Sequence, residues 1–170
     1  ELKFMNRAHN SKEAIKAVDM AQKNGFNNIS IDLIYGLPKQ TLGDWQKNLN
    51  IIPKLGIQHL SAYSLTVEKK TALYNLIKKQ KIKMSSDQMI VDQFNLLQEN
   101  TINQGFIHYE ISNFGKKGFF AIHNSNYWKG KRYLGIGPSA HSFNGNSRKW
   151  NVSSNKKYIY GVKNNTKYTD

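Results

Sequence analysis

The apolar residues along most of the chain alternate between helical and strand spacing. Ala14, Val18 and Ala21 recur at the spacing of one helix face, and Gly25 follows as a helix stop. The nearly continuous apolar run of residues 28–34 then predicts a buried strand. The pattern therefore begins with a helix that leads into a strand.

Helix starts are marked by residues that favour N-caps. Ser11 precedes the first apolar helix face, and two later pairs stand at the spacing of a capping box, Thr41 with Asp44 and Ser85 with Gln88. In such a box the side chain of each residue accepts a hydrogen bond from the backbone N–H of the other. We expect helices to begin at these three places.

Further strands are expected at residues 59–65, 106–111 and 133–136, with a short helix at 71–79. Helical connections between successive strands favour right-handed parallel βαβ units. We therefore predict an α/β fold with parallel strands. Because the pattern opens on a helix with no strand before it, we expect the remaining strands to lie upstream, so that this sequence is a fragment.

Length and composition exclude several classes of protein. The 170 residues are 39% apolar and contain no run of about eighteen apolar residues, and no basic and apolar leader opens the chain. We expect a cytoplasmic protein without a transmembrane segment. The sequence contains no cysteine, so this chain supplies no disulfide, no cysteine nucleophile and no thiolate ligand for an iron–sulfur cluster.

The chain is strongly basic, with a formal net charge of +14 from 25 basic and 11 acidic residues. Such a charge suits phosphates, anionic surfaces or acidic small molecules. Only three of the cations are arginine, however, and recognition of bases and phosphates favours arginine. A solvated lysine-rich surface is the favoured interpretation, and no nucleic-acid partner is expected.

Polar residues at or beyond the predicted strands are the first candidates for a site, because ligands bind at the carboxyl ends of parallel strands. Asp32 interrupts an apolar strand, where a carboxylate needs a cation or hydrogen-bond donors, and a structural ion pair or the capping of a nearby turn is the alternative. Arg7 stands before the first helix, where its guanidinium could hold a carboxylate or a ribose or lie on the surface. Thr66 follows the next strand. Glu68 and Glu110 are weaker candidates, which could act as a general acid and a general base.

A second candidate region is aromatic. His123 and Tyr127 are four positions apart and fall on one face if the segment is helical, so they could ligate a metal or line a flat ligand. Local packing of the aromatic residues, Trp128 included, is the alternative. His141 follows a glycine-rich turn, which lets backbone approach a ligand closely, although the turn lacks the spacing of a phosphate loop.

Five ordered motifs resemble those of the oxygen-independent coproporphyrinogen III oxidase family, and most closely those of its HemW branch of haem chaperones. They are IDLIYGLPKQT at 31–41, LSAYSLTVE at 60–68, YEISNF at 109–114, HNSNYW at 123–128 and YLGIGPSAHSF at 133–143.

The resemblance implies a radical S-adenosylmethionine (SAM) fold, a partial (β/α)6 barrel that holds a [4Fe-4S] cluster on a CxxxCxxC loop. That loop is absent here, so the resemblance implies that the cluster ligands lie outside this chain. Residues 1–143 would form the second half of the barrel, and residues 144–170 would begin the region that follows.

The resemblance also implies site residues. Arg7, Asp32, Thr66 and His141 match positions that contact SAM in the oxidase, but the oxidase has apolar residues where this chain has Thr66 and His141. For the chaperone branch, HNxxYW is a candidate haem motif, with His123 as an axial-ligand candidate and Tyr127 or Trp128 beside the porphyrin. The alternative is that the motif only fastens its loop.

Three functions follow from these expectations. The first is a HemW-like chaperone that binds haem and SAM and hands haem to acceptor proteins. The second is a coproporphyrinogen III oxidase, which decarboxylates propionates of a porphyrinogen, and the least favoured is a basic nucleic-acid-binding module. No catalytic residue is assigned, and this chain alone is expected to be inactive in radical chemistry because it lacks the cluster cysteines.

Overall fold

The computed structural model describes residues 1–169 and divides into two compact units, one up to Ala121 and one from Ile122 onward. The boundary expected at residue 143, between the barrel and the region that follows it, stays a prediction.

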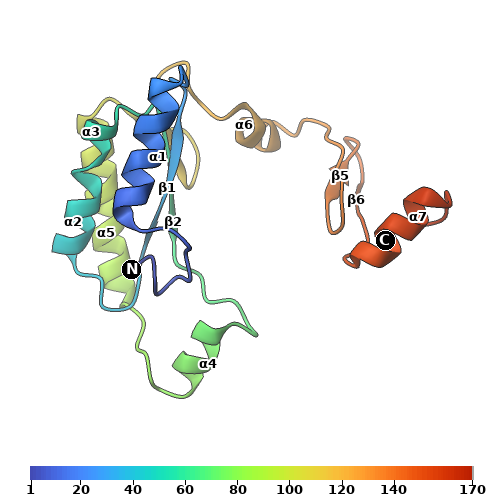
Figure 1. The fold of residues 1–170 in the computed structure, drawn as a ribbon, viewed down its shortest axis with the longest axis horizontal. Coiled ribbons are helices and arrows are strands. Elements are labelled where there is room, and N and C mark those ends of the chain that lie inside the picture. The colour runs from blue at the N-terminus through green and yellow to red at the C-terminus, as the bar shows by residue number, and fades with distance from the viewer. Residues whose placement is uncertain (170) are drawn as a thin grey trace. The chain divides into compact units, whose positions relative to one another are not determined.

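The first unit consists of alternating helices and strands, as the sequence pattern predicts (Figure 1). Its elements are α1 (Ser11–Lys23), β1 (Ser30–Tyr35), α2 (Leu42–Leu49), α3 (Ile52–Leu55), β2 (His59–Ser64), α4 (Ala72–Lys78), α5 (Asp87–Asn103), β3 (Ile107–His108) and β4 (Asn113–Gly115).

The sheet of the first unit is mixed, with strand order β1-β2-β4-β3. β1 and β2 pair in parallel, from Ser30 opposite His59 to Tyr35 opposite Ser64, which confirms the first predicted βαβ unit. The third predicted strand, β3, is not adjacent to β2, because β4 lies between them and pairs antiparallel with both. After His108 the chain turns back, and β4 pairs antiparallel with β2, because this places Phe114 opposite Leu60 in the core.

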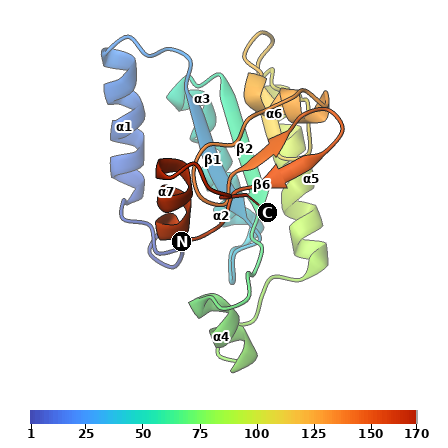
Figure 2. The same ribbon diagram turned by 90° about the vertical axis from the view of Figure 1, so that its right-hand side faces the viewer.

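The core lies on one face of this sheet. Trp45, Leu49, Leu60, Leu97 and Phe114 are fully buried there, contributed by α2, α5, β2 and β4. Figure 1 shows α2, α3 and α5 together on one side of β1 and β2, while α4 stands away from the sheet on the connection between β2 and α5. In Figure 2 the two parallel strands run side by side between α1 and α5. The opposite face of the sheet is free of the helices of this unit.

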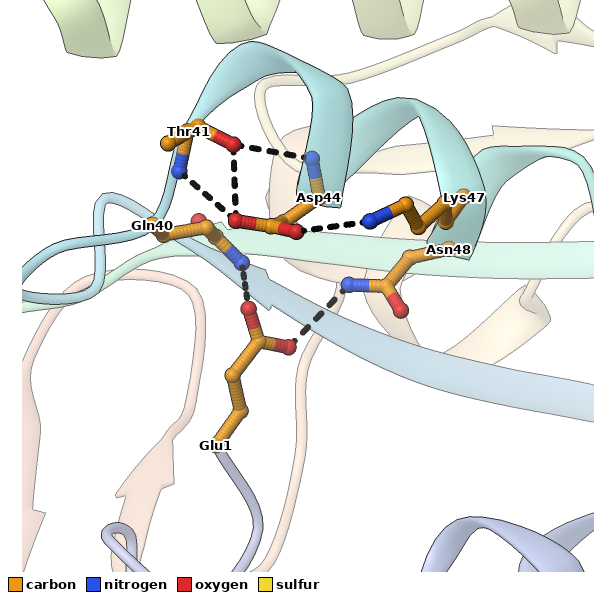
Figure 3. A network of polar contacts seen from close by, with 6 residues as sticks. All are labelled: Glu1, Gln40, Thr41, Asp44, Lys47 and Asn48. Carbon is orange, nitrogen blue, oxygen red and sulfur yellow. Dashed lines mark hydrogen bonds and ion pairs between the residues drawn. The ribbon is translucent and has the colours of Figure 1, made fainter.

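The predicted capping box at the start of α2 is confirmed (Figure 3). The Asp44 backbone N–H donates to Thr41 Oγ1 at 3.1 Å, and the Thr41 hydroxyl donates to Asp44 Oδ2 at 2.7 Å. The hydrogen bonds that the Asp44 carboxylate accepts from the Thr41 hydroxyl, from Lys47 and from the Thr41 backbone N–H lower the pKa of Asp44 to about 2. Because the folded pKa is below the ordinary value, this cap is intact at neutral pH and weakens as the pH falls toward 2.

Two other helices begin one residue away from the predicted caps. Asn10, not Ser11, caps α1, because its side chain accepts from two backbone N–H groups while Glu13 completes a capping box. Ser86 caps α5, whereas the Ser85 hydroxyl donates to the Leu37 carbonyl at 2.8 Å. Both differences arise where two neighbouring residues have capping side chains.

The second unit contains little regular structure. Its elements are α6 (Ile122–Trp128), β5 (His141–Phe143), β6 (Arg148–Trp150) and α7 (Asn155–Lys163), and β5 and β6 form an antiparallel hairpin.

The strand predicted at residues 133–136 does not form as such. Only Tyr133 makes a bridge, to Phe143. The Asn151 amide Nδ2 donates to the Gly135 and Gly137 carbonyls at 3.3 and 2.8 Å, so a side chain replaces a neighbouring strand as the partner of this backbone. Across residues 1–169, no helix has both the length and the apolar character needed to cross a membrane.

Candidate functional site

A polar row crosses the sheet of the first unit on the face opposite the core. Asp32 of β1 is paired with Ser61 of β2, and Ser61 is paired with Asn113 of β4. Paired residues on adjacent strands point to the same side, and successive residues alternate between sides. Since Leu60 and Phe114 face the core, the three polar side chains share the other face.

His59 lies one row away on the same face and connects two strands. Its Nδ1 is 2.7 Å from Ser30 Oγ, and its Nε2 is 2.7 Å from Tyr109 OH. Burial lowers the pKa of His59, and the nearby carboxylates of Asp32 and Glu110 oppose this shift. His59 is therefore neutral at pH 7 and acts as a hydrogen-bonding bridge.

The Tyr109 phenol fixes the orientation of this bridge. Its oxygen accepts from the Ala121 backbone N–H at 3.1 Å, and its own proton is then free to donate to His59 Nε2. Phe120 stacks on the Tyr109 ring at 4.4 Å between centroids and lies against Gly115. Burial raises the pKa of Tyr109, so the phenol keeps its proton at neutral pH.

The polar row has unmet hydrogen-bonding capacity. Asn113 is 3% exposed, and its amide Oδ1 is buried without a hydrogen-bond partner within residues 1–169. Such an atom normally has a partner in a native protein. Asp32, on the far side of Ser61 in the same row, is exposed and supplies carboxylate acceptors. The row therefore fits a ligand that offers hydroxyl or ammonium donors.

The other residues predicted for this site lie on the surface. Arg7 is exposed in the turns before α1, and within residues 1–169 no ion pair joins it to Asp32. Thr66 is exposed two residues beyond β2, at the level expected. Glu68 is exposed, and Glu110 Oε1 accepts from the Ser112 backbone N–H. The structure brings Asp32 near His59, and the roles of Arg7 and Thr66 in ligand binding stay predictions.

The loop after β1 is held by a buried glutamine. Gln93 of α5 accepts from the Gly36 backbone N–H at 2.9 Å and donates to Gln40 Oε1 at 3.1 Å. The Gln40 amide in turn donates to the Glu1 carboxylate, which also accepts from Asn48, as Figure 3 shows. Gly36 has a positive φ of 75°, a conformation that favours glycine. This network fixes the carboxyl end of β1.

The second unit places the candidate haem motif on α6, at the start of a row of rings. The His123 and Tyr127 rings meet edge to face at 4.9 Å, so the two residues share one helix face as predicted. Tyr127 contacts Tyr133 at 4.8 Å, and Tyr133 contacts Phe143 at 6.1 Å. His123 is exposed, and Trp128 is 62% exposed, so the motif is not a buried anchor.

His141 lies on β5, exposed, with its ring 5.9 Å from the Trp150 ring. A Cβ added at Gly135 would collide with the His141 carbonyl, so only glycine allows these backbones to pack together. The contact of His141 with SAM stays a prediction.

Sequence reasoning missed Ser61, Asn113 and His59. The available signal was the alternation of polar and apolar residues along β2, where His59 and Ser61 are separated by Leu60. Nothing in the sequence placed Asn113 beside Ser61, because that pairing depends on the return of β4. Within residues 1–169, no group of three or more His, Asp or Glu side chains is placed to hold a metal ion.

Comparison with known proteins finds relatives that are similar in sequence to most of this chain. No family model matches the chain. "Heme chaperone HemW" of Bacillus subtilis is 37% identical over 158 residues, covering 93% of this chain and 42% of the relative. The protein of the same name from Lactococcus lactis is 34% identical over 142 residues, covering 84% of this chain and 38% of the relative. The chain thus spans about two fifths of the length of these relatives.

A solved structure shows the same fold. The coproporphyrinogen III oxidase HemN of Escherichia coli, a radical SAM enzyme, superposes with a TM-score of 0.76 at 22% identity, over 99% of this chain and 41% of that one. The fold is therefore that of part of a radical SAM α/β protein. With the relatives above, this fold supports the interpretation that the chain is part of a protein of the radical SAM coproporphyrinogen oxidase-like family, in its HemW branch.

Proposed function

We propose that this chain is part of a cytoplasmic haem chaperone, that it binds haem through the α6 motif and that the whole protein passes haem to acceptor proteins. The observation that carries the proposal is the exposed His123 at the start of an aromatic row, in a chain whose relatives are named haem chaperones.

The residues of α6 fit a haem ligand. A neutral imidazole is a common axial ligand of haem iron, and His123 is exposed and free of backbone hydrogen bonds to its ring within residues 1–169. Tyr127 holds the imidazole edge to face, which limits its rotation. The Tyr127 and Tyr133 rings beyond it offer an apolar surface for a flat macrocycle.

The polar row of the sheet is the proposed place for SAM. When bound, this cofactor brings an ammonium, a carboxylate and ribose hydroxyls to the site. Asp32 and Asn113 would accept hydrogen bonds from its donors, and Arg7 would pair with its carboxylate. Thr66 and His141 are further predicted contacts. The chain's own residues do not fit the [4Fe-4S] cluster, because they include no cysteine.

The experiment that tests the haem proposal is a haem titration of the full chain, followed by the Soret band. We expect a shifted Soret band for the wild type and its loss in His123→Ala. His9→Ala is the matched control, since His9 is also exposed but lies in the first unit. An unchanged spectrum in His123→Ala, or equal loss in His141→Ala alone, would contradict the assignment of His123.

The oxidase alternative is separated by its product. If the protein that contains this chain and a cluster-bearing half converts coproporphyrinogen III into a vinyl product under anaerobic reducing conditions, decarboxylation is the function. We expect no such product.

A further inference from the structure

The charge of the chain is concentrated in the second unit. Residues 122–170 contain seven Lys, two Arg and one acidic residue, a net charge of +8, whereas the 121 residues before them carry 16 basic and 10 acidic residues, a net charge of +6. All nine cations of the second unit are exposed. Both ion pairs among the described residues belong to the first unit. The second unit therefore attracts an anionic partner.

Two of the chain's three arginines converge on the hairpin of this unit. Arg148 is paired with Phe143 across the β5–β6 hairpin, and its guanidinium lies over the Phe143 ring at 5.5 Å. Arg132 comes before the hairpin in the sequence, next to Tyr133. Its Nε is 3.2 Å from the position that a Cβ on Gly145 would occupy. In a chain with 22 lysines, arginine stands at both places, and its planar fork suits bidentate binding of a carboxylate.

The arginines are connected to the α6 motif by the row of rings. Tyr133 and Phe143 exchange two backbone hydrogen bonds of 2.9 Å, so Tyr133, Phe143 and Arg148 stand in one row across three segments. Tyr127 contacts Tyr133 at one end of that row and also contacts His123. A chain of ring contacts thus leads from an imidazole at one end to a guanidinium at the other.

A flat macrocycle with two carboxylates matches this arrangement. We propose that Arg148, with Arg132 beside the same hairpin, forms the carboxylate-binding end of the porphyrin site and pairs with the propionates of the ligand. The inference rests on the proposed function, because it concerns the same ligand, but it assigns the recognition of the propionates to residues outside the HNxxYW motif. Arg148 is the primary contact, since stacking on Phe143 orients its fork.

The test uses metal-free protoporphyrin IX, whose binding to the full chain is measured by its fluorescence. Without iron, the ligand reports propionate binding and does not depend on an axial histidine. We expect Arg148→Gln to weaken binding by about tenfold, the size of one lost charge-assisted pair. Arg148→Lys should retain part of the affinity, because it keeps the charge and loses the fork.

Lys149→Gln is the matched control, because Lys149 is the next residue, is also exposed and is paired with Ser142 on the other side of the hairpin. We expect it to weaken binding by less than about twofold at physiological salt. The dimethyl ester of protoporphyrin should bind wild type and Arg148→Gln equally.

Several outcomes would overturn the inference. Equal weakening by Arg148→Gln and Lys149→Gln would show general attraction to a basic surface, and tight binding of the ester to the wild type would show that the propionates are not recognised. If His123→Ala loses the Soret shift of haem while Arg148→Gln binds protoporphyrin normally, the proposed function stands and the inference fails. If the arginine effect appears without any His123 effect, the inference stands and His123 is not the ligand.

Discussion

The two units of this chain are stabilised in different ways. The first unit buries a cluster of large apolar side chains against its sheet, including Trp45, Leu60 and Phe114. The buried residues of the second unit among those described are Ser142, Asn151 and Gly161, while Leu134 and Ile136 are about four fifths exposed, at 76% and 83%. The first unit is therefore a folded body with its own core, and the second presents apolar and cationic surface that suits a ligand or a partner.

The largest loss of stability that tests this comparison is expected for a substitution of Trp45. Its ring is fully buried, contacts Tyr35 at 5.6 Å and donates through Nε1 to the Gln93 carbonyl at 2.9 Å. Trp45→Ala should lower the free energy of unfolding of the first unit by about 3–5 kcal/mol. Denaturant unfolding followed by far-UV circular dichroism measures it.

The matched change in the second unit is Trp150→Ala, because Trp150 is 47% exposed. It should lower the free energy of unfolding by less than about 1 kcal/mol. If both variants were destabilised equally, the second unit would have a core of its own and the comparison would be wrong.

A smaller effect is expected at Gln93, which holds the end of β1. Gln93→Leu would leave the Gly36 N–H buried without its partner, which should cost about 2 kcal/mol of unfolding free energy. Gln88→Leu on the same helix is the control, since the Gln88 side chain donates to Asp92 on the surface. A result in which the two variants have the same stability would remove Gln93 as the support of this loop.

The smallest effect is a pH dependence that arises from His59. Its folded pKa is below its ordinary value because of burial, so the unfolded chain binds more protons, and the stability is full above about pH 6.5 and falls as the pH is lowered from there. In His59→Gln this part of the pH dependence should disappear. Thermal unfolding between pH 5 and pH 8 measures it, with His9→Gln as control, and an unchanged slope in His59→Gln would contradict the assignment.

The sequence pattern predicted most of the first unit and little of the second. Helical spacing and caps placed the starts of α1, α2 and α5 within one residue, because each has an amphipathic face and a clear start signal. The return of β4 to pair with β2 was missed, since a three-residue strand carries almost no periodicity. Residues 133–136 look like a strand by composition, yet after the bridge at Tyr133 the Gly135 backbone bonds to the side chains of Ser142 and Asn151.

The candidate site was predictable to a similar extent. Asp32 stood out as a carboxylate in an apolar strand, and His123 with Tyr127 stood out by helical spacing, which the ring contact confirms. His59 and Asn113 could not be placed, because their positions follow from strand register across β1, β2 and β4.

The central claim of the proposed function is that the porphyrin binds to α6 and the β5–β6 hairpin of the second unit. Hydrogen–deuterium exchange of the full chain with and without haem tests this most directly. The account predicts slower exchange in α6 and in the β5–β6 hairpin, with β1 and β2 unchanged. Slower exchange along β1 and β2, with α6 unchanged, would contradict it.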